Sequence, residues 1–230
     1  MRSIYAVLVV VLGVGSTGYS QEDIKESCRV TVPPVIDGKM EDWQDDWRTD
    51  ADSKFEYNVC FDEQNLYIRL KTSDEMNQGK MGRLGFTVWL DPNGKKKKNL
   101  GLKYPTPTGR DFSKMNASPS NNSNPYERRL EMKRDLIRDT EVLELIGLAK
   151  ENIVSSRVGL MNGIQVIIVM DEKGDYIYEA KIPFKAYRLS KASIPVLAIG
   201  FETDKLKPIS GQRYTEMSKA TSLWVNVKLN

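Results

Sequence analysis

The chain has 230 residues, with 34 Lys and Arg against 31 Asp and Glu, a formal net charge of +3, and no histidine. Histidine is the side chain that titrates nearest neutral pH and the commonest metal ligand. Its absence removes the usual base of serine and cysteine nucleophiles and the usual nitrogen donor to zinc, so an enzyme of this composition would have to use carboxylates or lysines.

Residues 1–21 have the form of a signal peptide. Arg2 precedes an apolar stretch from Ile4 to Val14, and small or polar residues continue to Gln21. The stretch is too short for a transmembrane helix, which needs about 20 apolar residues, and no other long apolar run follows. We therefore expect a secreted or periplasmic protein without a transmembrane segment, in which residues 22–230 form a single domain.

Cys28 and Cys60 are the two cysteines of the chain. In an oxidising compartment an even number of cysteines favours a disulfide bridge. Two buried free thiols are the alternative, because one pair has no diagnostic spacing and a bridge requires a Cα separation of about 4.4–6.8 Å.

Short stretches of alternating apolar residues predict β-strands along most of the chain. The first two stretches form a hairpin around the turn at 62–65 with one buried face, and the third ends at the turn Asp91-Pro92-Asn93-Gly94. A short strand is expected within 141–148, a second hairpin turns at 171–175, and two more strands follow. The apolar positions are Phe55, Tyr57, Val59 and Phe61, then Leu66, Ile68 and Leu70, Phe86, Val88 and Leu90, Leu143 and Leu145, Tyr178, Ala180 and Ile182, Leu197, Ile199 and Phe201, and Leu223, Val225, Val227 and Leu229. This pattern predicts an all-β fold, a two-sheet antiparallel β-sandwich.

Five segments, taken in order, resemble the family 9 carbohydrate-binding modules and the related DOMON-like sandwich domains. They are IDGKMEDW (36–43), CFDEQNLYIRLKTSD (60–74), FTVWLDPNG (86–94), YIYEAKIPF (176–184) and LWVNVKLN (223–230). The resemblance covers most of the chain after the signal peptide apart from about residues 95–140. It implies a jelly-roll-like sandwich that binds a carbohydrate and has no catalytic activity.

Alternation places Trp89 and Trp224 on the faces opposite the apolar stripes of their strands. Trp89 shares its side with Thr87, and Trp224 shares its side with Asn226. An indole on a polar sheet face can stack on a sugar ring while polar neighbours bind the hydroxyl groups, and the family resemblance implies a sugar held between two tryptophans. We predict Trp89 and Trp224 as ligand-binding residues. The alternative is that loops or an insertion cover them.

Trp43 and Trp47 follow the tight turn Asp37-Gly38 with i, i+4 spacing, which predicts a short helical turn with both indoles packed on one side. The nearby carboxylates are typical calcium ligands, but they form no EF-hand pattern and a charged surface turn is the favoured interpretation, so the sequence leaves structural calcium open. They are Asp42, Asp45, Asp46, Asp50 and Asp52. Haem, which related DOMON domains bind, is not expected because histidine, a usual ligand of haem iron, is absent.

The segment of about residues 95–140 is a basic insertion into the resemblance. Between Asn93 and Arg138 there are twelve Lys or Arg and four Asp or Glu, and residues 126–138 are expected to form a helix. The insertion is either a solvated excursion that packs Leu130 and Ile137 on one end of the sandwich, or a patch for an anionic polysaccharide or an envelope surface. No nucleic-acid-binding motif is present, so nucleic acid is not an expected partner.

The sequence thus predicts a non-catalytic carbohydrate-binding protein. One alternative is an envelope protein that binds an anionic partner through the basic insertion. Another is a carboxylate-dependent glycoside hydrolase, which needs two carboxylates about 5–9.5 Å apart. Glu179 and Asp62 are the candidates for such a pair, but the first lies on a predicted strand beside Lys181 and the second lies in a hairpin turn.

Overall fold

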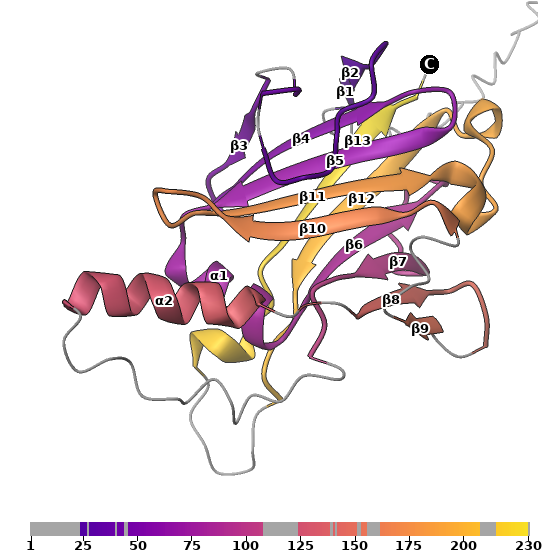
Figure 1. Ribbon diagram of the computed structural model, residues 1–230. Coiled ribbons are helices and arrows are strands. Elements are labelled where there is room, and N and C mark those ends of the chain that lie inside the picture. Colours follow the sequence, from indigo (N-terminus) through magenta and orange to yellow (C-terminus); the bar gives the residue numbers. More distant parts are fainter. Residues whose placement is uncertain are drawn as a thin grey trace, which may run out of the picture.

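Two β-sheets pack against each other, and two helices lie at one end of the sheets in the computed structural model of the chain (Figure 1). The structure describes residues 24–26, 28–39, 41–43, 46–107, 124–138, 140, 142–150, 153–155, 162–207 and 215–229. The predicted signal peptide lies outside these ranges, as does the part of the basic insertion between residues 108 and 123. The two-sheet sandwich predicted from the alternating pattern is confirmed.

The first sheet has the strand order β10-β11-β5-β4-β2, and β3 also pairs with β4. The bounds are Cys28–Arg29 for β2, Arg48–Asp50 for β3, Phe55–Phe61 for β4, Asn65–Thr72 for β5, Gln165–Met170 for β10 and Tyr176–Pro183 for β11. Its two hairpins, β4–β5 and β10–β11, are the hairpins that the sequence predicts. We call it the six-stranded sheet.

The second sheet has the order β1-β13-β12-β6-β7-β8-β9, and we call it the seven-stranded sheet. The bounds are Ile24–Glu26 for β1, Phe86–Asp91 for β6, Leu100–Lys103 for β7, Leu143–Ile146 for β8, Ile153–Ser155 for β9, Val196–Thr203 for β12 and Ser222–Lys228 for β13. Strand β7 was not predicted, so the basic insertion begins by adding a strand to this sheet.

The strands pair antiparallel with two exceptions among the described residues. β1 runs parallel to β13, and β2 runs parallel to β4. Each sheet therefore carries one short parallel strand contributed by the N-terminal part of the chain, which an entirely antiparallel sandwich would not have. Between Glu26 and Cys28 the chain passes from one sheet to the other.

The core lies between the two sheets and consists of the apolar positions that alternate along the strands. Aromatic rings bridge the layers: the ring centroids of Phe55 and Phe86 are 6.0 Å apart, and those of Tyr57 and Phe201 are 5.7 Å apart. Phe86 also meets Tyr178 edge to face at 5.1 Å. Each such pair contributes about 0.5–1.5 kcal/mol beyond the area that it buries.

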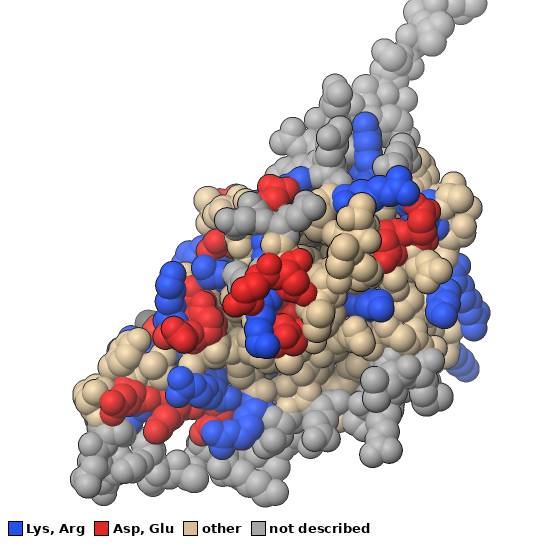
Figure 2. All heavy atoms as spheres, turned by 45° about the horizontal axis from the view of Figure 1, so that its top comes forward, with Lys and Arg blue, Asp and Glu red and all other residues tan. Residues whose placement is uncertain are grey.

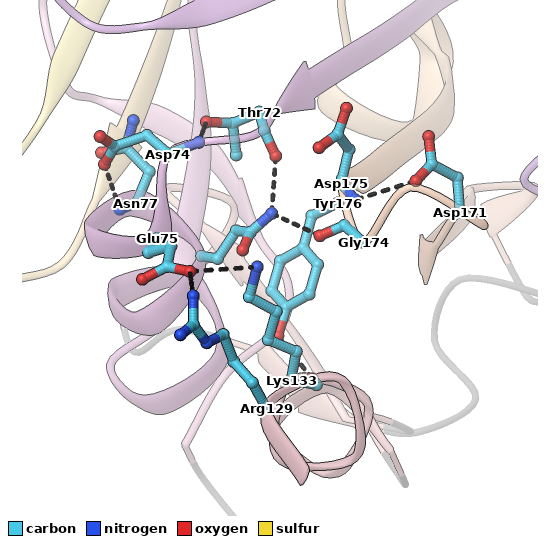
Figure 3. A network of polar contacts seen from close by, with 11 residues as sticks. Thr72, Asp74, Glu75, Asn77, Arg129, Lys133, Asp171, Gly174, Asp175 and Tyr176 are labelled. Carbon is cyan, nitrogen blue, oxygen red and sulfur yellow. Dashed lines mark hydrogen bonds and ion pairs between the residues drawn. The ribbon is translucent and has the colours of Figure 1, made fainter. Parts of the chain in front are cut away.

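Helix α1 (Glu75–Arg83) closes one end of the sandwich and was not predicted. It begins where the side chain of Asp74 accepts a hydrogen bond from the backbone N–H of Asn77, an N-terminal cap. The buried amide of Gln78 donates to the carbonyl oxygens of Thr72 and Gly174, both at 2.9 Å, which ties the helix to the sheet (Figure 3). The sequence does not show this helix as an apolar repeat, because its buried positions include the polar residues Asn77, Gln78 and Lys80.

Helix α2 (Pro125–Ile137) is the helix predicted over 126–138, and it packs beside α1. Arg129 and Lys133 reach Glu75 of α1 at 3.2 and 3.7 Å, and the hydroxyl of Tyr176 donates to the Lys133 carbonyl oxygen at 2.6 Å (Figure 3). Ile137 is buried in the core and Leu130 is half-buried, as the first of the two interpretations of the insertion expects. This part of the basic insertion is therefore docked onto the end of the sandwich.

Candidate functional site

Trp89 and Trp224 lie in one row across the outer face of the seven-stranded sheet. Gly200 of β12 is the register partner of Trp89 on one side and of Trp224 on the other. Gly101 of β7 is the partner of Trp89 on its second side. Neighbouring strands are about 4.8 Å apart, which puts the Cα atoms of the two tryptophans about 10 Å apart. Both side chains are partly exposed.

The two glycines of this row let the indoles lie down on the sheet. A Cβ atom on Gly200 would be 2.8–2.9 Å from three atoms of the six-membered ring of Trp224. A Cβ atom on Gly101 would be 2.8 Å from Cε3 of Trp89. Non-bonded carbon atoms in proteins do not approach a Cβ atom this closely, so any larger residue would displace the rings. Each indole thus turns one face toward a glycine and the other face away from the sheet.

Polar side chains hold Trp89 in this position. Its indole Nε1–H donates to Oε2 of Glu202 at 2.7 Å, and the other carboxylate oxygen of Glu202 pairs with Lys98 at 2.5 Å. Lys103 pairs with Asp204 at 2.5 Å on the same sheet. Lys98 and Lys103 belong to the start of the basic insertion, so part of its charge is neutralised beside the tryptophans.

The turn after β6 is stabilised by hydrogen bonds to the side chain of Asp91. Asp91 accepts a hydrogen bond from the N–H of Asn93 on one carboxylate oxygen and from the N–H groups of Lys95 and Lys97 on the other, at 2.9–3.0 Å. Burial opposes ionisation, but these backbone amides keep the pKa of Asp91 below its usual value. This carboxylate stabilises the turn that the sequence predicts and is not a metal ligand in it.

The outer face of the six-stranded sheet is covered, in contrast, by the segment that contains IDGKMEDW. The backbone N–H groups of Asp37 and Gly38 donate to Oε2 of Glu179 at 3.2 and 2.9 Å. Trp43 packs against Cys60 in a small separate apolar cluster on this face. The predicted single buried face of the β4–β5 hairpin is therefore wrong, because both of its faces are covered.

Arg69 of β5 lies at the centre of this covered face and is 1 % exposed. Its guanidinium carbon is 4.0 Å from the ring centroid of Trp47 and 5.3 Å from that of Trp43. The predicted helical turn is wrong: residues 41–43 form a turn, 46–47 are not helical, and β3 begins at Arg48. Both indoles stack on the Arg69 guanidinium, a contact for which a planar, delocalised cation is well suited.

Glu179 is fully buried beneath Asp37 and Gly38. Burial raises its pKa to about 7, although the two backbone amides partly offset this shift. Its second oxygen, Oε1, has no hydrogen-bond partner within the described residues. The carboxylate anchors the covering segment and does not face a cleft.

Asp62, the other candidate for a hydrolytic pair, is also structural. It accepts hydrogen bonds from the N–H groups of Gln64 and Asn65 and, at 2.7 Å, from the hydroxyl of Tyr67. Burial opposes ionisation, but the hydroxyl and these amide groups keep the pKa of Asp62 low. Neither Asp62 nor Glu179 supports the hydrolase alternative.

Cys28 and Cys60 are joined by a disulfide, with a Cα separation of 4.5 Å. Within the described residues, no group of three or more Cys, Asp or Glu side chains is arranged to hold a metal ion. Asp42 accepts a hydrogen bond from the Val35 N–H, and Asp50 accepts one from the Ser53 N–H. No helix in the described ranges has the length and apolarity needed to cross a membrane.

No family model and no curated protein sequence matches the chain. Among solved structures, two similar ones are family 9 carbohydrate-binding modules from Caldicellulosiruptor kristjanssonii, one in complex with glucose and one with cellotriose. The first has 11 % identity, 88 % coverage of this chain, 93 % coverage of that chain and a TM-score of 0.40. The second has 12 % identity, coverages of 87 % and 82 %, and a TM-score of 0.37.

Proposed function

We propose that the protein binds a carbohydrate on the outer face of the seven-stranded sheet, with sugar rings stacked on Trp89 and Trp224. The observation that carries this proposal is the cross-strand row in which the two indoles alternate with Gly101 and Gly200. Stacking on a sugar uses the face of an indole. The glycines leave that face directed away from the sheet.

The arrangement favours an extended ligand. Both rings belong to the same sheet surface and lie along one row, so they form a platform that does not close around a single sugar. Their separation of about 10 Å, two strand spacings, suits successive rings of an oligosaccharide. This differs from a sugar held between two facing tryptophans, which the family resemblance implied.

The polar groups beside Trp89 would serve binding and orientation. Glu202 accepts from the Trp89 indole and pairs with Lys98, so its carboxylate is already engaged on both oxygens. A non-catalytic role fits this arrangement, because hydrolysis would need a free acid and a second carboxylate. The location that we propose is secreted or periplasmic, from the form of residues 1–21, and a disulfide is compatible with that compartment.

The test is binding of neutral oligosaccharides, first on a glycan array and then by calorimetry. Trp89→Ala and Trp224→Ala should each weaken the affinity by about tenfold or more, equivalent to about 1.4 kcal/mol. The control is Tyr126→Ala, which removes an aromatic ring that is 58 % exposed on α2. Unchanged affinity in both tryptophan variants, with the fold intact, would exclude the site.

The envelope-interaction alternative, based on the basic insertion, has less support. Five of its described cations already pair with acidic side chains, and acidic and basic side chains are interspersed over much of the surface in Figure 2. These cations are Lys98, Lys103, Arg129, Lys133 and Arg138. Such pairing reduces the field available to an anionic partner.

A further inference from the structure

A pocket of 540 Å³ lies at the end of the six-stranded sheet, between the β4–β5 turn and two short helical turns, η2 (Phe184–Tyr187) and η3 (Lys191–Ser193). It is on the other sheet from Trp89 and Trp224. Its volume is in the range of small-molecule sites, about 300–1,000 Å³. The polar side chains that line it include Glu63, Gln64, Asn65, Lys181, Lys185 and Lys191.

Backbone hydrogen bonds hold the walls of the pocket together. The N–H of Phe184 donates to the carbonyl oxygen of Gln64 at 2.9 Å, and the N–H of Leu189 donates back to that of Phe184 at 2.9 Å. Asn65 and Pro183 are register partners on adjacent strands. The site is therefore preformed on strand ends and a bonded turn, which reduces the entropy that a ligand must overcome.

The charge of the pocket is positive because its acidic neighbours are already engaged. Glu63 is bound by Arg29 and, at 3.0 Å, by Lys191, and the Lys191 hydrogen bond lowers the pKa of Glu63. Lys181 and Lys185 have no ion pair within the described residues.

We infer that this pocket binds the anionic group of an acidic saccharide, with Lys181 and Lys185 as its charge partners. The volume exceeds what a bare inorganic anion needs, and the remaining lining suits a sugar. Gln64, Asn65 and Ser190 offer hydrogen bonds for hydroxyl groups. Leu189, which is partly exposed, offers apolar surface for a ring, and the buried Pro183 and Phe184 lie behind it in the pocket wall. This second site does not depend on the function proposed for the tryptophan row.

The experiment is calorimetric titration of the whole protein with three ligands: an oligogalacturonate, a sulfated oligosaccharide and a neutral oligosaccharide of the same length. The wild type should bind at least one acidic ligand, more weakly as salt is raised. Lys181→Gln combined with Lys185→Gln should weaken that binding by about tenfold or more, because charge-assisted hydrogen bonds are lost. The comparison of the carboxylated and sulfated ligands identifies the anionic group.

Three controls make the result specific. Lys173→Gln removes an exposed lysine from the β10–β11 turn, at the other end of β11, and should leave the affinity unchanged. Lys181→Arg with Lys185→Arg keeps the charge and should retain most of the affinity. Trp89→Ala should not alter it, which separates this site from the tryptophan row.

Two results would overturn the inference. One is binding of both acidic ligands by the double glutamine variant with wild-type affinity. The other is inorganic sulfate competing on equal terms with the oligosaccharide, since the pocket would then select an anion and not a sugar. A thermal unfolding midpoint for each variant close to that of the wild type shows that a loss of affinity is not a loss of fold.

Discussion

The outer faces of the two sheets are built from the same alternating sequence pattern, but one face is buried under another part of the chain and the other face is partly exposed. On the six-stranded sheet, the outward positions of the central strands carry Arg69 and Glu179, and a chain segment covers both of them. On the seven-stranded sheet, the outward positions carry two tryptophans beside two glycines, and the indoles stay partly exposed. Polarity of a strand position therefore does not decide its exposure here.

The difference shows what each face is built for. A buried arginine and a buried glutamate need partners, and stacking indoles and backbone amides supply them on the covered face. That face secures the N-terminal segment. Among the described residues no segment of this kind covers the tryptophan row, and its glycines cost local stability in return for a flat aromatic surface.

The largest effect that separates the two faces should come from Trp43→Ala. This side chain is 7 % exposed and lies against Cys60 and Tyr67, so its loss should lower the free energy of unfolding by about 3–5 kcal/mol. Trp224→Ala, on the partly exposed outer face of the seven-stranded sheet (the open face), should lower the free energy of unfolding by about 1 kcal/mol. Urea unfolding of both variants measures the contrast, and equal losses would mean that the open face is as tightly packed as the covered one.

The disulfide should have the next largest effect, since it also fastens the covered face. Cys28 and Cys60 are 32 residues apart in the sequence. Replacing both by serine should lower the free energy of unfolding by about 3 kcal/mol, mainly through the unfolded state. Reductant should destabilise the wild type to a similar degree and leave the double variant unaffected. Insensitivity of the wild type to reductant would contradict this.

The pH dependence of the covered face should follow Glu179. Its pKa is about 7 in the folded protein against an ordinary value of 4.5, so the folded state binds more protons between these pH values. Protonation of Glu179 therefore stabilises the folded state fully below pH 4.5. The free energy of unfolding should fall by up to about 3 kcal/mol as the pH rises through 7. Glu179→Gln should flatten this part of the profile. Glu172→Gln, at an exposed turn, is the control and should keep the wild-type slope.

The smallest change in stability should come from the open face. Gly200→Ala should displace the Trp224 ring, lower the affinity for the oligosaccharide by about tenfold, and cost about 1 kcal/mol of stability. Gly79→Ala is the matched control, because a Cβ at this helical position meets nothing within 4 Å. It should stabilise the protein by about 0.5–1 kcal/mol and leave binding unchanged. Full affinity in Gly200→Ala would show that ring orientation is unimportant.

The strands were predictable because alternation reports burial between two sheets directly. Leu197, Ile199 and Phe201 are all fully buried at the positions where the period of two places them. The turn Asp91-Pro92-Asn93-Gly94 was predictable for a local reason as well, since its aspartate accepts hydrogen bonds from amides two to six residues further along the chain. Both features depend on neighbours in sequence.

The covered face was not predictable, because its partners are distant in sequence. The bond between Gly38 and Glu179 joins residues 141 positions apart, and nothing local distinguishes Arg69 from an ordinary exposed arginine. The sequence contains a further signal for the tryptophan row, which includes the glycines beside the two indoles. Gly200 interrupts an apolar strand on the side opposite Leu197, Ile199 and Phe201, and a glycine within a strand often marks a close approach.

The parallel pairing of β1 with β13 bears on how the protein responds to mechanical force. Because the first and last described strands run side by side in the same direction, pulling the two chain ends apart loads their hydrogen bonds in shear, all at once, and does not open them one by one. If that pair yields, extension from the N-terminal side stops at Cys28, whose covalent link to Cys60 passes the load into β4. Tension applied at the N-terminal end is thus borne first by the β1–β13 pair and then by the disulfide, while the six-stranded sheet stays folded.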